Sequence, residues 1–244
     1  MSVSLWSCTC LPQAGLRQIQ RLQDSDIQNI CKVIKLYRVM AKIQGQLFVI
    51  SAPSGAGKTT IAKQLIKRTD NLYYSVSHTT RKPRKGETDG IDYYFVSKTA
   101  FTEMIHNGEF LEWADVYGEF YGTSRKAVTD MLYQGKDILL DLDIQGAKNI
   151  KDIFSDAILT FILPPSIDIL YRRLVGRGTD SKDIIDMRKQ KACEEIKNCS
   201  WFDYVVINED IETAIRDAQA IIFSCRCRFL RQKDKIKSCF PDLF

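Results

Sequence analysis

A glycine-rich segment at residues 52–60 contains the residue types that bind a polyphosphate. Its glycines let backbone amides approach phosphate oxygens closely, its lysine supplies a cation for β- and γ-phosphates, and the next hydroxyl suits a bound Mg²⁺. The segment therefore predicts a Walker A loop for a nucleoside triphosphate, with Lys58 as a catalytic contact and Thr59 as a metal ligand. Its members are Ala52, Pro53, Ser54, Gly55, Ala56, Gly57, Lys58, Thr59 and Thr60.

The residues on either side of this loop predict the elements that must hold it. Residues 46–51 are mostly apolar and β-branched, as in a buried strand, and Ile61, Leu65 and Ile66 follow at helical spacing. Strand, loop and helix is the order that a Walker A site requires. Ala52 stands where the motif usually has glycine, and we expect it to be tolerated if its φ is negative.

A second buried strand is predicted within residues 136–146, and it ends in carboxylates. Asp141 and Asp143 are two positions apart, which predicts that both side chains lie on one face of the strand. Acids beyond the carboxyl ends of parallel strands can hold Mg²⁺ or the ligand. A third strand at 158–163 is followed by a helix. We therefore predict an α/β fold with a central parallel sheet flanked by helices.

A basic loop suits a second, smaller anion. Arg81 and Arg84 lie in a segment that Pro83 keeps extended. Two neighbouring guanidinium groups repel each other unless an anion lies between them, and a phosphate group accepts paired hydrogen bonds from both. Tyr93 and Tyr121 can add hydroxyl donors to the same group.

Glu112 lies in the apolar context Phe-Leu-Glu-Trp, where a buried carboxylate needs a partner or a ligand. Guanine presents N1–H and its 2-amino group side by side, and one carboxylate can accept both hydrogen bonds. Adenine has an acceptor at N1 and would leave the carboxylate facing a lone pair, which disfavours it strongly.

These segments together resemble the guanylate kinases. The likeness is carried by Ser77–Phe95 with its Thr-Thr-Arg-x-Pro-Arg-x-Gly-Glu core, by 108–114 and by 121–123, and it extends from about residue 46 to about residue 230. The resemblance implies a P-loop kinase that moves the γ-phosphoryl group of ATP to GMP, and also to dGMP, with Mg²⁺. It further implies small-molecule substrates, no nucleic-acid or membrane partner, a cytoplasmic location and a monomer or homodimer.

The resemblance also implies roles for individual residues. Asp141 joins Thr59 on the Mg²⁺ side, and Asn208 borders the adenine pocket. Arg173, Arg177 and Arg188 contact the phosphates from a lid at about residues 173–190. A GMP-binding insert spans about residues 74–130. Residues of this insert, together with Asp143, form the acceptor site: Ser77, Arg81, Arg84, Tyr93, Glu112, Tyr121, Gly122, Thr123 and Asp143.

Two other functions are weighed against this one. Guanylate-kinase-like binding modules keep the acceptor site but lack the P-loop, so the intact Gly57-Lys58-Thr59 disfavours a catalytically weak module. A kinase for another nucleotide or sugar phosphate is disfavoured by Tyr93 and Glu112. His78 replaces a small hydroxyl residue common in the family, and no general base is expected.

Composition is consistent with a globular enzyme. The chain has 244 residues, 45% hydrophobic and 27% charged, with a net charge of +5, which suits an anionic ligand. No run approaches the roughly 18 apolar residues of a membrane span. Of eight cysteines, Cys8, Cys10, Cys225 and Cys227 form two C-x-C pairs. A zinc site from these pairs is conceivable, but the spacing is unusual and free thiols are favoured.

The two ends of the chain differ from its centre. Residues 1–40 are basic and poor in acids, which is compatible with a mitochondrial transit peptide, an appended helix at 16–39, or a true start at Met40. We favour the start at Met40 or a dispensable extension, leaving a kinase domain at 41–244. A helical pattern runs from Ile211 to Phe229, and the basic residues beyond Cys225 are interpreted as a solvated helix rather than a surface for RNA or an acidic partner.

Overall fold

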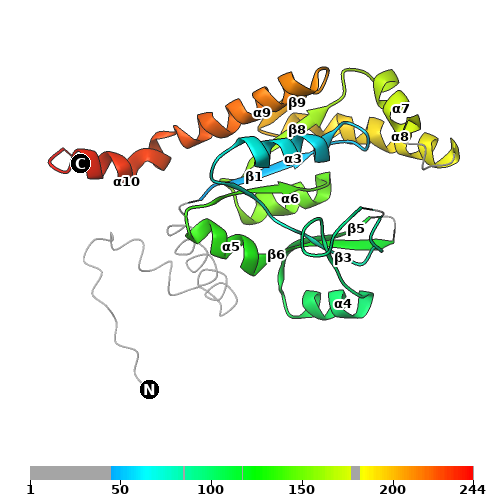
Figure 1. Cartoon of the computed structure of the whole chain (residues 1–244), viewed down its shortest axis with the longest axis horizontal. Coiled ribbons are helices and arrows are strands. Elements are labelled where there is room, and N and C mark those ends of the chain that lie inside the picture. The colour runs from blue at the N-terminus through cyan, green and yellow to red at the C-terminus, as the bar shows by residue number, and fades with distance from the viewer. Residues whose placement is uncertain (1–44, 85, 117, 177–181, 244) are drawn as a thin grey trace, which may run out of the picture. The chain divides into compact units, whose positions relative to one another are not determined.

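The computed structural model describes residues 45–84, 86–116, 118–176 and 182–243 (Figure 1). The chain divides into two compact units, Met1–Lys42 and Ile43–Phe244. The expected helix at 16–39 and the expected start at Met40 lie outside the described residues. So does Arg177.

The second unit is built on a five-stranded sheet in the order β2-β7-β1-β8-β9, and every neighbouring pair is parallel. Strands β1 and β7 are almost wholly apolar and buried, as expected for a parallel sheet that is covered on both faces. The strands predicted from sequence are confirmed, as is the α/β class. The strands are β1 (Leu47–Ser51), β2 (Leu72–Tyr74), β7 (Asp137–Asp141), β8 (Ile158–Leu163) and β9 (Tyr204–Ile207).

Helices cover both faces of this sheet, because alternate residues of each strand point to opposite sides. Phe48 and Ile50 of β1 pack with α3 (Lys58–Arg68) and α9 (Ile211–Arg226). The intervening Val49 packs in a second cluster on the other face. That cluster includes residues of α5 (Arg125–Tyr133) and α6 (Ile144–Ile153).

A second, four-stranded sheet has the order β4-β3-β6-β5. Strands β5 and β6 form an antiparallel hairpin, and α4 packs against it through Phe101, whose ring lies 4.5 Å from that of Phe110. This sheet carries the acceptor-site residues predicted from sequence. Its elements are β3 (His78–Thr79), β4 (Tyr94–Phe95), α4 (Lys98–His106), β5 (Phe110–Val116) and β6 (Glu119–Ser124).

Two further helices lie between β8 and β9 in the chain. They are α7 (Ile167–Val175) and α8 (Lys182–Lys197), followed by the short 3₁₀ helix η1 (Asn198–Trp201). Helices α7 and α8 pack together through Leu170, Leu174, Ile185 and Ala192.

The helical pattern that begins at Ile211 is confirmed as far as Arg226. Helix α9 ends at Arg226, and α10 (Phe229–Cys239) begins after a break. Cys225 is the last buried residue of α9, whereas α10 buries none of its side chains. The break allows Arg231 of α10 to turn back toward the sheet, where it donates to the Gly45 carbonyl at 3.1 Å.

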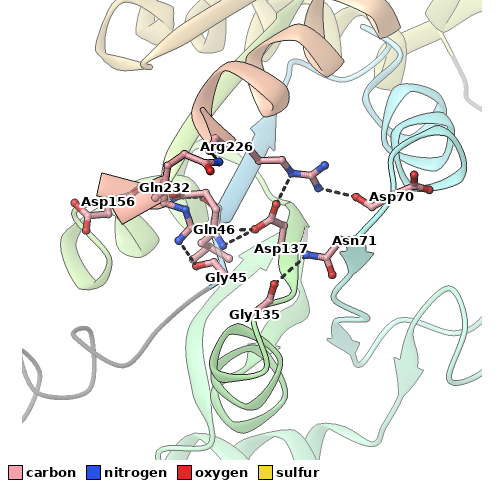
Figure 2. Close-up of polar contacts among 11 residues, drawn as sticks. Gly45, Gln46, Asp70, Asn71, Gly135, Asp137, Asp156, Arg226 and Gln232 are labelled. Carbon is pink, nitrogen blue, oxygen red and sulfur yellow. Dashed lines mark hydrogen bonds and ion pairs between the residues drawn. The ribbon is translucent and has the colours of Figure 1, made fainter. Parts of the chain in front are cut away.

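A buried carboxylate at the start of β7 collects these polar contacts (Figure 2). Asp137 is 2% exposed. It accepts from the Gln46 amide at 2.7 Å and from Arg226 Nε at 2.8 Å, and Arg231 Nη2 lies 3.4 Å away. Arg226 also donates to the Asp70 carbonyl. Asp137 therefore joins the C-terminal helices to the amino-terminal ends of the strands. Asp141 lies at the opposite, carboxyl-terminal end of β7.

Within the described ranges, no helix is both long enough and apolar enough to cross a bilayer. The described cysteines are free thiols, and no cluster of metal-binding side chains occurs among the described residues. Cys8 and Cys10 lie outside those residues.

Candidate active site

A cleft with a volume of about 370 Å³ lies between the glycine-rich loop, the second sheet and α8. Most residues expected from sequence to contact a nucleotide line it. They are Ala52, Pro53, Ser54, Gly55, Gly57, Lys58, Thr59, Thr60, Ser77, Arg84, Tyr93, Glu112, Tyr121, Gly122, Asp141, Asp143 and Arg188.

The backbone of the glycine-rich loop explains its residue types. Gly57 has φ of 97°, in the left-handed region, and a side chain there would lie 2.3 Å from Asn208 Nδ2. Asn208 is buried and donates to the Ala56 carbonyl at 2.7 Å, so it supports the loop from behind. Ala56 is itself fully buried and does not line the cleft. Among the described non-glycine residues only Asn71 has a positive φ. Ala52 therefore has the negative φ at which alanine was expected to be tolerated in this loop.

Lys58, Thr59 and Asp141 form the polar end of the cleft. Lys58 Nζ forms an ion pair with Asp141 and donates to the Leu142 carbonyl at 2.8 Å. The hydroxyl of Thr59 lies 3.5 Å from Asp141 Oδ2. Two oxygen donors on one side of a phosphate-binding loop are the ligand type that a hard divalent cation prefers. The residues present therefore fit a metal–triphosphate complex.

Asp143 lies outside the strand to which the sequence assigned it. Strand β7 ends at Asp141, and Asp143 is the N-cap of α6, where its Oδ1 accepts from the Gly146 amide at 2.8 Å. The expectation that Asp141 and Asp143 share a strand face is therefore wrong, because the chain turns into a helix between them. Both residues nevertheless line the cleft.

The predicted base-recognition carboxylate is deeply buried. Glu112 is 6% exposed and accepts a 2.6 Å hydrogen bond from the Thr123 hydroxyl. Burial raises its pKa to about 7; the Thr123 hydrogen bond opposes this rise, and the nearby Asp143 carboxylate adds to it. Glu112 lines the cleft, so its carboxylate can also reach a ligand there.

Gly146 lies behind the Glu112 carboxylate, and sequence reasoning missed it. A Cβ at this position would lie 2.9 Å from Glu112 Oε2 and 3.3 Å from Asp143 Oδ1. Glycine therefore allows the two carboxylates to approach α6. The only sequence indication was a glycine three residues after an aspartate that could cap a helix.

Glu87 organises the loop that carries the two predicted phosphate-binding arginines. Its Oε1 accepts from Arg81 Nη2 at 2.9 Å, and its Oε2 accepts from the Arg84 backbone amide at 2.7 Å. Arg81 Nε also donates to the Tyr121 hydroxyl at 3.2 Å. Glu87 therefore supplies a counter-charge to Arg81 and holds the backbone of Arg84, while binding of a phosphate by the two guanidinium groups stays a prediction. The Arg81 hydrogen bond in turn lowers the pKa of Glu87.

The remaining aromatic residue of the phosphate end is Tyr93. Its ring lies 5.9 Å from that of Tyr121 at a steep angle, and the Arg81 guanidinium lies 5.4 Å from the Tyr93 ring centroid. Burial raises the pKa of Tyr93 to about 12, so its hydroxyl stays protonated and remains a donor.

The expected lid arginines do not all reach the same place. Arg188 of α8 lines the cleft. Arg173 of α7 instead donates to the Asn208 carbonyl at 3.0 Å. Arg173 and Asn208 line a second hollow on the other side of Gly57, together with Ile211. Arg173 Nη1 and Asn208 Oδ1 are buried there without a hydrogen-bond partner among the described residues, so both can serve a ligand.

His78 packs in the second sheet and does not line the cleft. Its ring stacks on Tyr94 with centroids 4.8 Å apart and meets Phe110 edge-on at 5.6 Å. Burial lowers the pKa of His78, so the ring is neutral near pH 7. At this position, where the family commonly has a small hydroxyl residue, His78 therefore serves in packing.

Two further charged residues line the cleft that sequence reasoning did not assign. Lys191 and Glu195 follow Arg188 on α8 at spacings of three and seven residues. These spacings place all three side chains on one face of the helix. The helical pattern alone could have grouped them with Arg188.

The family model for guanylate kinases matches residues 44–225. The chain is 52% identical to a guanylate kinase of Carboxydothermus hydrogenoformans over 179 residues, which cover 73% of this chain and 88% of the relative. It is 46% identical to one of Clostridioides difficile over 199 residues, or 82% and 97% of the two chains. The crystal structure of guanylate kinase from Anaplasma phagocytophilum superposes with a TM-score of 0.67 at 35% identity, covering 81% of this chain and 96% of that one. The chain therefore belongs to the guanylate kinase family of nucleoside monophosphate kinases.

Proposed function

We propose that the chain transfers the γ-phosphoryl group of ATP to GMP and dGMP, with Mg²⁺ as the divalent metal. The observation that carries the proposal is the shared cleft: a phosphate-binding loop and the buried Glu112 carboxylate both line it. A donor site alone would fit any P-loop enzyme, whereas this pairing also defines the acceptor.

The acceptor is held at two ends. The Glu112 carboxylate accepts from guanine N1–H and its 2-amino group, with Ser77, Gly122 and Thr123 alongside. Arg81, Arg84, Tyr93 and Tyr121 bind the monophosphate through charge-assisted hydrogen bonds. Asp143, fixed as a helix cap, borders the same pocket.

The donor is held by the loop. Backbone amides and Lys58 bind its phosphates, and Thr59 and Asp141 hold the metal, which supplies charge neutralisation at the β- and γ-phosphates when bound. Nucleotide binding replaces the present ion pair of Lys58 with Asp141, so each side chain is released toward its ligand. Asn208 and Arg173 border the donor base in the second hollow.

The transfer itself needs positive charge and positioning rather than a general base. Lys58 and Arg188 supply charge within the cleft, and Arg177 of the proposed lid at about 173–190 is assigned to the same role. We further propose that the kinase domain spans 41–244 with a GMP-binding insert at about 74–130. It acts on small molecules as a monomer or homodimer in the cytoplasm, without a nucleic-acid or membrane partner.

The test is a coupled assay of ADP formation with GMP, dGMP, AMP, CMP and UMP as acceptors. We expect turnover with the two guanine nucleotides and loss of at least about 10²-fold in kcat for Lys58→Ala, as for a transition-state charge contact. Turnover with AMP or a pyrimidine nucleotide in preference to GMP would contradict the assignment. Binding of GMP without turnover would favour the binding-module alternative.

A further inference from the structure

The face of α8 that lines the cleft carries a carboxylate that the proposed mechanism does not use. Glu195 lines the cleft with Arg188 and Lys191, and its side chain is 19% exposed, whereas Glu194 beside it is exposed to solvent. Lys191 Nζ lies 3.8 Å from Glu195 Oε1. That ion pair is longer than a hydrogen bond, so the carboxylate keeps acceptor capacity toward the cleft.

Glu195 lines the same cleft as Asp143 and Lys58. Burial raises its pKa, Lys191 opposes the rise, Asp143 adds to it and Lys58 opposes it. Asp143 also acts on Glu112. Glu195 therefore lies within electrostatic reach of Asp143, which borders the base end, and of Lys58, where the phosphoryl group is transferred.

A nucleoside monophosphate in this cleft places its sugar between those two ends. The base occupies the Glu112 pocket, and the receiving phosphate must face Lys58 for transfer. Every other assigned contact addresses the base or the phosphate, and none addresses the sugar. Another carboxylate oxygen of the cleft, Asp143 Oδ1, is already bonded to the Gly146 amide.

We propose that Glu195 is a specificity-determining residue that accepts hydrogen bonds from the ribose hydroxyls of the acceptor, and that it favours GMP over dGMP. The inference rests on the proposed function, since it concerns the same bound nucleotide. An ionised carboxylate is acceptor-only and can pair with two vicinal hydroxyls, whereas deoxyribose offers one donor fewer. Lys191 balances the charge of the Glu195 carboxylate from 3.8 Å, a distance too long for a hydrogen bond.

The experiment compares kcat/KM for GMP and for dGMP in the wild type, Glu195→Gln and Glu195→Ala. A hydrogen bond to a charged group predicts a wild-type preference for GMP of about tenfold or more. We expect the preference to fall in Glu195→Gln and to approach one in Glu195→Ala, mainly through KM for GMP, while KM for ATP is unchanged. Glu194→Gln, one residue away and exposed, is the matched control and should keep the wild-type ratio.

Three results would overturn the inference. One is a wild-type ratio near one. Another is an equal loss for GMP and dGMP in both Glu195 variants, which would show that Glu195 acts only by ordering α8 or Lys191. The third is an equal effect in Glu194→Gln. Failure of the wild type to phosphorylate either nucleotide would instead contradict the proposed function, so the two failures are distinguishable.

Discussion

Glu87 holds Arg81 and the backbone of Arg84 with its two carboxylate oxygens, at 2.9 and 2.7 Å. The loop is therefore preorganised before any phosphate binds. Glu87→Gln keeps the size of the side chain but removes its charge. We expect KM for GMP to rise about tenfold, because a charge-assisted contact that positions both arginines is weakened.

The control for this loop is the exposed pair Lys126–Asp130, which lies on α5 outside the loop. Asp130→Asn should change KM for GMP by less than about twofold, as surface ion pairs contribute little. KM for ATP should stay constant in both variants. An unchanged KM for GMP in Glu87→Gln would remove Glu87 from the positioning role.

Glu112 predicts a pH dependence of acceptor binding. Its pKa is raised from its ordinary value near 4.5 to about 7 in the free protein, and only the ionised form can accept both guanine donors. The ratio of kcat/KM for GMP between wild type and Glu112→Gln should therefore be about 10–100 at pH 8, the cost of a mispaired buried group. It should shrink below pH 7. A ratio that is constant between pH 6 and 8 would contradict the proposed ionisation of Glu112. Titration of the substrate phosphate affects both proteins equally and therefore cancels in the ratio.

The same pKa predicts an effect on stability. Because the folded protein binds the Glu112 proton more tightly than the unfolded chain, the stability that this provides is present at low pH. It is lost as the pH rises from about 4.5 through about 7. Without nucleotide, Glu112→Gln should therefore gain stability relative to wild type between pH 5 and pH 8, as measured by urea unfolding. A stability difference between the two proteins that does not vary with pH would contradict the raised pKa of the buried Glu112 carboxyl.

Gly146 gives a steric test of the base pocket. An added Cβ would lie 2.9 Å from Glu112 Oε2, and the backbone there is helical and accessible to alanine. Gly146→Ala should displace the carboxylate and lower kcat/KM for GMP by about tenfold, in the range for one disturbed polar contact, with KM for ATP unchanged. Gln145→Ala, exposed on the same helix, is the matched control. Full activity of Gly146→Ala would show that the pocket accommodates the methyl group.

Asp137 gives a stability test away from the cleft. Asp137→Asn removes the charge that Arg226 and Arg231 face, and should cost about 2–4 kcal/mol, somewhat below a fully buried pair because both arginines are partly exposed. Kinetics with GMP and ATP should not change in the folded enzyme. The exposed pair Lys126–Asp130 supplies the control: Asp130→Asn should cost less than about 0.5 kcal/mol. Urea unfolding measures both, and equal costs would contradict the role of the buried carboxylate.

The extension gives a final prediction. The family model begins at residue 44, just after Met40. A chain beginning at Met40 should be soluble and should match the full chain in kcat and in KM for both nucleotides. Loss of folding or of activity would show that residues 1–39 belong to the working enzyme.

The sequence predicted the sheet and the phosphate loop because both are local patterns. Strands β1, β7 and β8 are apolar runs with sharp boundaries, and the Walker A residues are contiguous. The role of Asp143 was not predictable in this way, since the end of β7 depends on where its pairing with β1 stops, at Ile50 with Asp141. The roles of Glu87 and Glu195 depend on the path of a loop and on the orientation of a helix. Neither can be predicted from a local sequence pattern.

Arg173 illustrates the same limit. The family resemblance assigned it a contact with the phosphates, whereas in the structure it donates to the Asn208 carbonyl. Residue spacing placed it on a helix, but only packing of α7 through Leu170 and Leu174 determines the direction of its guanidinium group.

The Asp137 network has a consequence for the order in which the chain is made. Asp137 precedes both arginines that compensate its charge by roughly 90 residues, at separations of 89 and 94. During synthesis from the N-terminus, the central strands leave the ribosome while this carboxylate has no counter-charge to bury against. We therefore expect the amino-terminal ends of the strands to pack only after the last helices have emerged. Folding of the domain would then finish near the end of translation, rather than strand by strand.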